Sequence, residues 1–162
     1  MFSGQVRLSG ALLANPAGQP DDILLVAGQV VVTGEVATIG YRQVIVAGQL
    51  AAPAAGRDVI ESRVQVQGQA GWYRGDEARV FYDDVTLGPD FFRLLDGPVS
   101  LVVFGDLTIS GGVTESMVRE KVSGITLFSD AEVPAGLVGV VQVLAVDAFG
   151  VIRALADDGP GS

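Results

Sequence analysis

Aspartate is the residue type that offers this chain most of its chemistry. The sequence has 162 residues with no histidine and no cysteine, which excludes imidazole bases, thiolate nucleophiles and disulfides. Carboxylates are therefore the side chains that remain to act as acids, bases or metal ligands. Some of them recur in the second half of the chain. The recurring residues are Asp83, Asp84, Asp106, Asp130 and Asp147. Clustered carboxylates can hold Ca²⁺ or Mg²⁺, or share acid–base work.

The same aspartates have a simpler interpretation as turn residues, because Asp hydrogen-bonds to nearby backbone and tolerates the conformations of turns. The fixed Gly–Asp spacing of Ca²⁺-binding repeats is absent, and no nucleophile, base and orienting group come together in the sequence. We therefore predict turn residues, with no cofactor, no metal and no active site. The alternative is a carboxylate-dependent enzyme, or a protein that binds sugar or metal at these residues.

Glutamine recurs with a strict spacing. Gln29, Gln49 and Gln69 follow one another at intervals of twenty residues, and each comes directly after a glycine. On neighbouring parallel strands these amides would lie about 4.8 Å apart, close enough to hydrogen-bond in a row. Such a row can recognise a polar partner or fix the register of the strands, and we predict the structural role.

Trp72 and Tyr73 form an adjacent aromatic pair within a charged neighbourhood. If the pair is exposed, it would be a suitable anchor for a partner protein. Alternatively, Trp72 fills core space left by the small Ala70 and Gly71. The sequence does not separate these alternatives.

These residues are positioned by a ten-residue pattern, V-x-V-x-G-x-L-x-x-P, that covers nearly the whole chain. Its eight copies begin at intervals of 16 to 24 residues, at Val6, Leu24, Val44, Val64, Val80, Leu101, Ile125 and Val143. The first and third positions are always apolar, which predicts a strand with one buried face, and the fifth is Gly, Asp or Ser, which predicts a corner. The intervals are too long for hairpins, so successive copies are expected to stack in parallel.

Several segments between the copies have helical patterns. We predict short helices in "GPDFFRLLDGP" and "SGGVTESMVREK", weaker ones in "PAAGRDVIESR" and "PAGLVGVVQ", and loops in the earlier segments. The predicted fold class is an α/β solenoid in which residues 1–155 form a single domain of about eight coils. Each coil has one parallel strand and returns through a short helix or loop, and residues 156–162 form a flexible acidic tail. An all-β right-handed β-helix is the alternative.

Two known families share this kind of pattern. A strand, a corner and a helix or loop within about 20 residues resembles the leucine-rich-repeat class of β/α solenoids, although Gly stands where that family has Asn or Cys. The segment "GQVRLSGALLA" is similar to bactofilins, the polymer-forming right-handed β-solenoids of bacteria. Bactofilins lack helical returns, and "DFFRLLDG" and "ESMVREK" depart from them in this respect.

The charge and hydropathy of the chain limit the classes of partner that we expect. The net charge is −9, from 19 acidic against 10 basic residues, and no basic cluster is present, so nucleic acid is not an expected partner. The chain shows neither a signal-peptide pattern nor an apolar run long enough to span a bilayer, so we expect a soluble, cytoplasmic protein without membrane insertion.

The expected function is a non-enzymatic scaffold that binds a partner protein or itself. The first and last coils of a solenoid leave backbone groups unpaired, and an end or a strand face is therefore the expected interface. The residues predicted to contribute are the aromatic pair and the apolar residues of the last coil: Trp72, Tyr73, Val143, Phe149 and Ile152.

Overall fold

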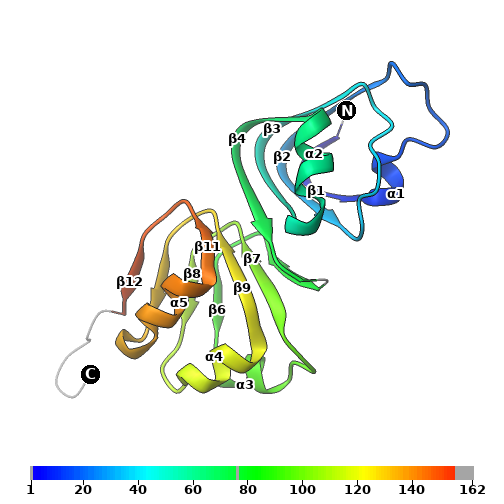
Figure 1. Ribbon diagram of the computed structural model, residues 1–162. Helices are drawn as coiled ribbons and strands as arrows, with labels where there is room; N and C mark the ends of the chain where they lie inside the picture. Colours follow the sequence, from blue (N-terminus) through cyan, green and yellow to red (C-terminus); the bar gives the residue numbers. More distant parts are fainter. Residues whose placement is uncertain (1, 76, 156–162) are drawn as a thin grey trace.

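All strand pairs in the structure are parallel, and they form three four-stranded sheets. The computed structural model describes residues 2–75 and 77–155, so the predicted tail at 156–162 lies outside the described residues. The first sheet contains β1 (Phe2–Ser9), β2 (Ile23–Thr33), β3 (Gln43–Pro53) and β4 (Val64–Tyr73), in that order. The predicted mixture of parallel strands and short helices is confirmed, and it is loosely compatible with a solenoid-like fold (Figure 1).

The other two sheets alternate along the chain. One contains β5 (Ala78–Phe81), β7 (Val99–Val103), β9 (Val122–Leu127) and β11 (Ala145–Ala148). The other contains β6 (Val85–Leu87), β8 (Leu107–Ile109), β10 (Ala131–Val133) and β12 (Ile152–Ala154). Each coil of this half therefore has two short strands, and the prediction of one strand per coil was wrong here. The aspartate-containing corner ends the first strand and redirects the chain into the second.

Short helices form the third side of the coils, except between β2 and β3, where residues 34–42 are a loop. The helices are α1 (Gly10–Leu13), α2 (Arg57–Arg63), α3 (Pro89–Arg93), α4 (Glu115–Lys121) and α5 (Val138–Leu144), with 3₁₀ turns at Ala54–Gly56 and Ala135–Leu137. The helices predicted between the repeat copies are confirmed. Thr114 begins α4 by accepting a hydrogen bond from the Met117 N–H at 3.2 Å. Within the described ranges, no helix combines the length and apolar character needed to cross a bilayer.

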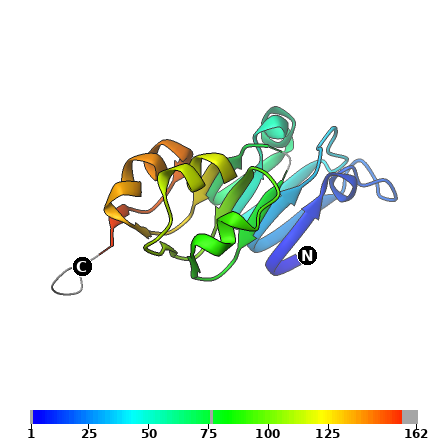
Figure 2. The same ribbon diagram turned by 90° about the horizontal axis from the view of Figure 1, so that it is seen from below.

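The strands of the eight copies lie in two stacks of four, and not in one continuous ladder. Strand β4 pairs with β3, whereas β5 pairs with β7 in another sheet. The prediction that every copy stacks on the preceding one was therefore wrong between the fourth and fifth copies. The interval from Val64 to Val80 is the shortest in the sequence and contains no helix, so the chain turns away before it completes a coil. Figure 2 shows the two stacks at opposite ends of the molecule.

The first stack bends at a row of glycines. Gly4, Gly28, Gly48 and Gly68 are in register, with φ of +93°, +112°, +136° and +148°. A Cβ on Gly48 would lie 2.2 Å from the Gly28 carbonyl oxygen, so both the backbone angle and the close approach require glycine. The row divides each long strand into a first arm before the glycine and a second arm after it.

Three copies were placed out of register. Gly4, not Gly10, pairs with Gly28, because the apolar alternation is the same in both arms of a strand. Arg79 pairs with Leu101, so the fifth copy is displaced by one residue. Ala145 pairs with Ile125 and, after a bulge, Ala148 pairs with Leu127, so the eighth copy is displaced by two and then by three residues, and Val143 lies on α5. The degenerate apolar pattern permits these shifts.

The two stacks share a small core. It consists of buried residues from the second arms of the first sheet and from the outward face of the β5–β11 sheet: Val31, Ala51, Tyr73, Val102, Phe104 and Phe128. The sheets approach so closely that a Cβ on Gly71 would lie 2.4 Å from Thr126 Cγ2. The Asp147 carboxylate, on β11, accepts a hydrogen bond from the Trp72 N–H of β4 at 2.7 Å. The long second arms of the first sheet therefore hold the second stack in place.

Candidate functional site

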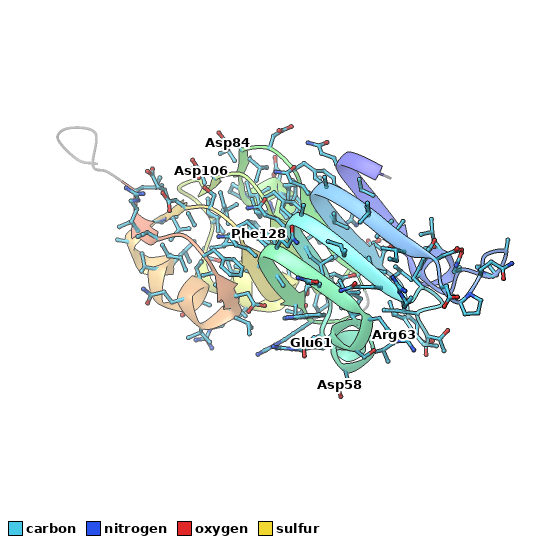
Figure 3. All side chains as sticks on the ribbon, turned by 90° about the horizontal axis from the view of Figure 1, so that it is seen from above. Asp58, Glu61, Arg63, Asp84, Asp106 and Phe128 are labelled. Atoms are coloured by element: carbon cyan, nitrogen blue, oxygen red, sulfur yellow. The ribbon has the colours of Figure 1, made fainter. Side chains whose placement is uncertain are left out.

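The aspartates predicted to gather at a corner form a hydrogen-bonded row in the second stack. Asp84 Oδ1 accepts from the Asp106 N–H at 2.8 Å, and Asp106 Oδ1 accepts from the Asp130 N–H at 3.2 Å. Asp130 Oδ1 accepts from the Val151 N–H of the last coil at 2.8 Å. Each carboxylate therefore ties its own coil to the next one. Figure 3 shows Asp84 and Asp106 along one edge of the molecule.

The electrostatics of this row are those of a structural anion. The hydroxyl of Ser129 and then the N–H of Asp130 stabilise the Asp106 carboxylate and lower its pKa. Asp130 additionally pairs with Arg153, with 2.9 Å between its Oδ2 and the guanidinium Nη2. In the part of the chain that the structure describes, no group of three acids is arranged to hold a metal ion. An exposed depression of about 290 Å³ lies over the row, and its lining includes these aspartates and Arg153 together with Thr86, Thr108 and Glu132.

Two of the five aspartates stand apart from the row. Asp83 is an exposed turn residue beside Asp84. Asp147 lies on β11 instead of at the corner, where its carboxylate binds the Trp72 N–H. The sequence pattern grouped Asp147 with the corner aspartates because the eighth copy was placed out of register. In the true register Val151 takes the corner position of the last coil, so the aspartate row ends there.

An aromatic row that the sequence reasoning missed runs beside the aspartates. Tyr82, Phe104, Phe128 and Phe149 stack in succession, with ring centroids 5.5, 4.6 and 5.4 Å apart and nearly parallel planes. The signal was present, because an aromatic residue precedes each corner aspartate by two positions. Phe128 is 5% exposed, whereas Phe149, at the end of the row, is 42% exposed.

The glutamines form the corresponding row in the first stack. Gln29, Gln49 and Gln69 are in register, and Gln49 Nε2 donates to Gln69 Oε1 at 2.9 Å. Gln5 continues the row opposite Gln29, and it was missed because the first copy was misplaced. The residue after the corner is thus an amide in one stack and a carboxylate in the other.

Trp72 and Tyr73 are both inside the protein. Trp72 is 8% exposed, with the Arg57 guanidinium 5.1 Å from its ring centroid. Tyr73 is 4% exposed, and its hydroxyl donates to the Val32 carbonyl oxygen at 2.6 Å. Burial raises the pKa of Tyr73 to about 12. The pair packs as core residues do, and it is not an exposed anchor.

The last coil is where apolar side chains reach solvent. Val143, Val146, Phe149 and Val151 are 78%, 50%, 42% and 60% exposed. Ile152 is half-buried, although Ala131, its partner in the preceding coil, is fully buried. This surface, which we call the C-terminal end, consists of these five residues. It lies at the opposite end of the molecule from β1 (Figure 2).

Comparison with known proteins and structures found no match. No protein-family model matches the chain, and neither a curated protein nor a solved structure matches it. The resemblances to leucine-rich repeats and bactofilins therefore rest on sequence pattern alone, and the functional argument rests on the geometry described above.

Proposed function

We propose that this protein is a non-enzymatic assembly scaffold, built as an α/β solenoid, that joins a second copy of itself through the C-terminal end. The observation that carries the proposal is a group of four exposed apolar side chains beside two strands at sheet edges. Strands β11 and β12 each stand last in their sheets, among the described strands. Their outer N–H and C=O groups are available to another chain.

The solenoid description is supported by the way the coils are joined. Equivalent residues of successive coils pair in parallel and in register, and rows of glycine, glutamine, aspartate and aromatic residues run across them. Each coil therefore buries its apolar face against its neighbours, as in repeat proteins. A leucine-rich-repeat-like coil with a glycine or aspartate corner describes this arrangement.

Burial of the C-terminal end would stabilise a dimer. Phe149 and Ile152 reach solvent because no described coil covers them, since their counterparts in the preceding coil, Phe128 and Ala131, are 5% exposed and fully buried. Val143 and Val151 take positions that reach solvent in the preceding coil as well, but those positions hold the charged Glu120 and Asp130 there. Covering the end of the stack removes apolar area from water, which contributes about 25 cal/mol per Å² before the costs of association. The charged residues of the two edge strands, Asp147 of β11 and Arg153 of β12, are engaged with the Trp72 N–H and with Asp130.

The opposite end of the second stack is a poor complement. Arg79 of β5, Asp83 after β5, and Asp90 and Arg93 of α3 are exposed there. Head-to-tail contact would bury Asp83 and the Arg79–Glu77 and Arg93–Asp90 ion pairs against the apolar end, and removing these charges from water is costly. Contact between two C-terminal ends buries apolar surface on apolar surface and closes after two copies. We therefore expect a dimer and not a filament.

Light scattering on the whole chain tests this proposal. We expect the wild-type protein to be a dimer at micromolar concentrations, and Val143→Lys and Val151→Lys to be monomers whose circular dichroism shows a retained fold. Leu94→Lys is the matched control, because Leu94 is 82% exposed next to α3 at the opposite end of the stack. A wild-type monomer at all concentrations, or dimers unaffected by both lysines, would contradict the proposal. Filaments in electron micrographs would show that the copies associate head to tail and do not form a closed dimer.

A further inference from the structure

Strand β4 leaves part of the first stack uncovered. Among the described strands it pairs with β3 alone, so it forms an edge of the first sheet. Val44 and Val46 of β3 are each 1% exposed, because β2 and β4 flank them. Their partners Val64 and Val66 on β4 are only half-buried. The first arm of β4 therefore offers both an open backbone edge and apolar side chains that one more strand would cover.

A cavity lies directly under this edge. It has a volume of about 300 Å³ and opens between β4 and α2. Its apolar lining consists of Leu50, Ile60, Val64, Val66, Ala70 and Trp72. Arg57 of α2 also lines it, with its guanidinium over the Trp72 ring. The cavity is large enough to take one or two small apolar side chains from a strand laid along the edge.

The open part of the edge is short. The Trp72 N–H is already taken by the Asp147 carboxylate, and Gly71 lies against Thr126 of the second stack. An added strand can therefore run beside residues 64–69 but not beside the second arm. A second copy of this chain does not fit in register. With Gly4 opposite Gly68, its β1 would carry Val6–Ser9 alongside residues 70–73, where the second stack lies.

Positive charge lies where β4 begins. Arg42, Glu61 and Arg63 line a second depression at the start of the strand, and Figure 3 shows Glu61 and Arg63, both on α2. Glu61 is paired with Arg57 at 2.8 Å. Arg42 and Arg63 make no ion pair with any described residue, and Arg63 donates to the Tyr41 carbonyl oxygen at 3.1 Å. These two guanidinium groups favour a carboxylate at the amino end of a parallel strand.

We propose that the first arm of β4 binds a short extended segment of another protein by parallel strand addition. Backbone hydrogen bonds to β4 hold the segment, and acidic residues at its amino end lie beside Arg42 and Arg63. Small apolar residues at alternate positions cover Val64 and Val66 and enter the cavity. This site is separate from the C-terminal end and does not depend on dimer formation.

A synthetic peptide provides the probe. We would use Asp-Asp-Val-Thr-Val-Ser-Gly-Gln, blocked at both ends, with Lys-Lys-Val-Thr-Val-Ser-Gly-Gln as its charge-reversed match. Trp72 is the single tryptophan of the chain and lines the cavity, so its fluorescence reports occupancy directly. We expect saturable quenching or a spectral shift with the acidic peptide and binding several-fold weaker with the lysine peptide.

Variants locate the binding. Ala70→Phe fills the cavity and should abolish the fluorescence change, with circular dichroism confirming that the variant is folded. The double change Arg42→Glu and Arg63→Glu should reverse the preference between the two peptides. Arg119→Glu, an exposed arginine on α4 in the other stack, is the control and should leave binding unchanged.

Several outcomes would overturn the proposal. These are no saturable change with either peptide, equal affinity for both peptides, and a preference that the double glutamate variant does not alter. Peptide binding that is lost in Val151→Lys but kept in a folded Ala70→Phe would place the site at the C-terminal end instead. Dimers that Ala70→Phe dissociates, but Val151→Lys does not, would show that a second copy occupies the edge.

Discussion

The residue that follows the corner contributes side-chain hydrogen bonds between coils in both stacks. The residue after the corner is glutamine in the first stack, where an amide can donate to the next amide in the row. In the second stack it is aspartate, and its carboxylate accepts the N–H of the equivalent residue in the next coil. Both kinds of side chain bond to the equivalent residue of the next coil and so favour the observed register. The three aspartates of the row therefore have a structural role in stacking the coils.

The aspartate row predicts a specific pH dependence. Because the folded-state pKa of Asp106 is lowered, its contribution to stability is complete above the unfolded-state pKa of about 3.9 and is lost as the pH falls through the folded-state value. We expect Asp106→Ala to melt at a lower temperature than wild type at pH 7, and this difference to shrink in acid. Asp106→Asn, which keeps an acceptor oxygen, should lie between them at pH 7. Thermal melts of the three proteins across this pH range measure the effect, and a difference that stays constant with pH would contradict it.

At the scale of elements, the sequence predicted the strands and helices better than their partners. Apolar alternation marks a strand and its buried face, and the cap at Thr114 marks where a helix begins. Alternation has a period of two, however, so it does not distinguish one arm of a kinked strand from the other. Because of this ambiguity, the sequence pattern assigned the corner of the first copy to Gly10. In the structure, Gly4 is the residue that pairs with Gly28. In the true register the first interval is 24 residues long, from Gly4 to Gly28, whereas the misplaced copy made it 18.

The glycine row is the element on which the first stack depends. Gly48 has φ +136°, and a Cβ there would lie 2.2 Å from the Gly28 carbonyl oxygen. We expect Gly48→Ala to be strongly destabilising, by more than the ~1 kcal/mol that a left-handed backbone angle alone costs, because the strands must also move apart. Gly97→Ala is the control, since a Cβ there meets nothing within 4 Å and its φ is not in the left-handed region. Urea denaturation compares the two, and equal stability would show that the row adapts.

At the scale of the whole molecule, the join between the stacks was beyond sequence reasoning. The Trp72–Asp147 hydrogen bond links residues 75 positions apart, and no periodic pattern relates them. Val31 and Ala51 face the second stack because the chain turns back after β4. The one feature of the repeat that indicates this turn is the short interval from Val64 to Val80. By contrast, exposure at the last coil was predictable, because a stack without a following coil must leave its last apolar face uncovered.

The shared core predicts that the two stacks unfold together. Trp72 fluorescence reports the first stack, and far-ultraviolet circular dichroism reports both, so their transitions should coincide in the wild-type protein. Gly71→Val inserts a side chain where a Cβ alone would lie 2.4 Å from Thr126 Cγ2, and it should force the sheets apart. We expect the two transitions to separate in this variant, because each stack keeps its own core of buried side chains. Gly139→Ala, on α5 with open space around its Cβ position, should leave the transitions coincident. Coincident transitions in a destabilised Gly71→Val would instead show that the second stack has no stability without the first.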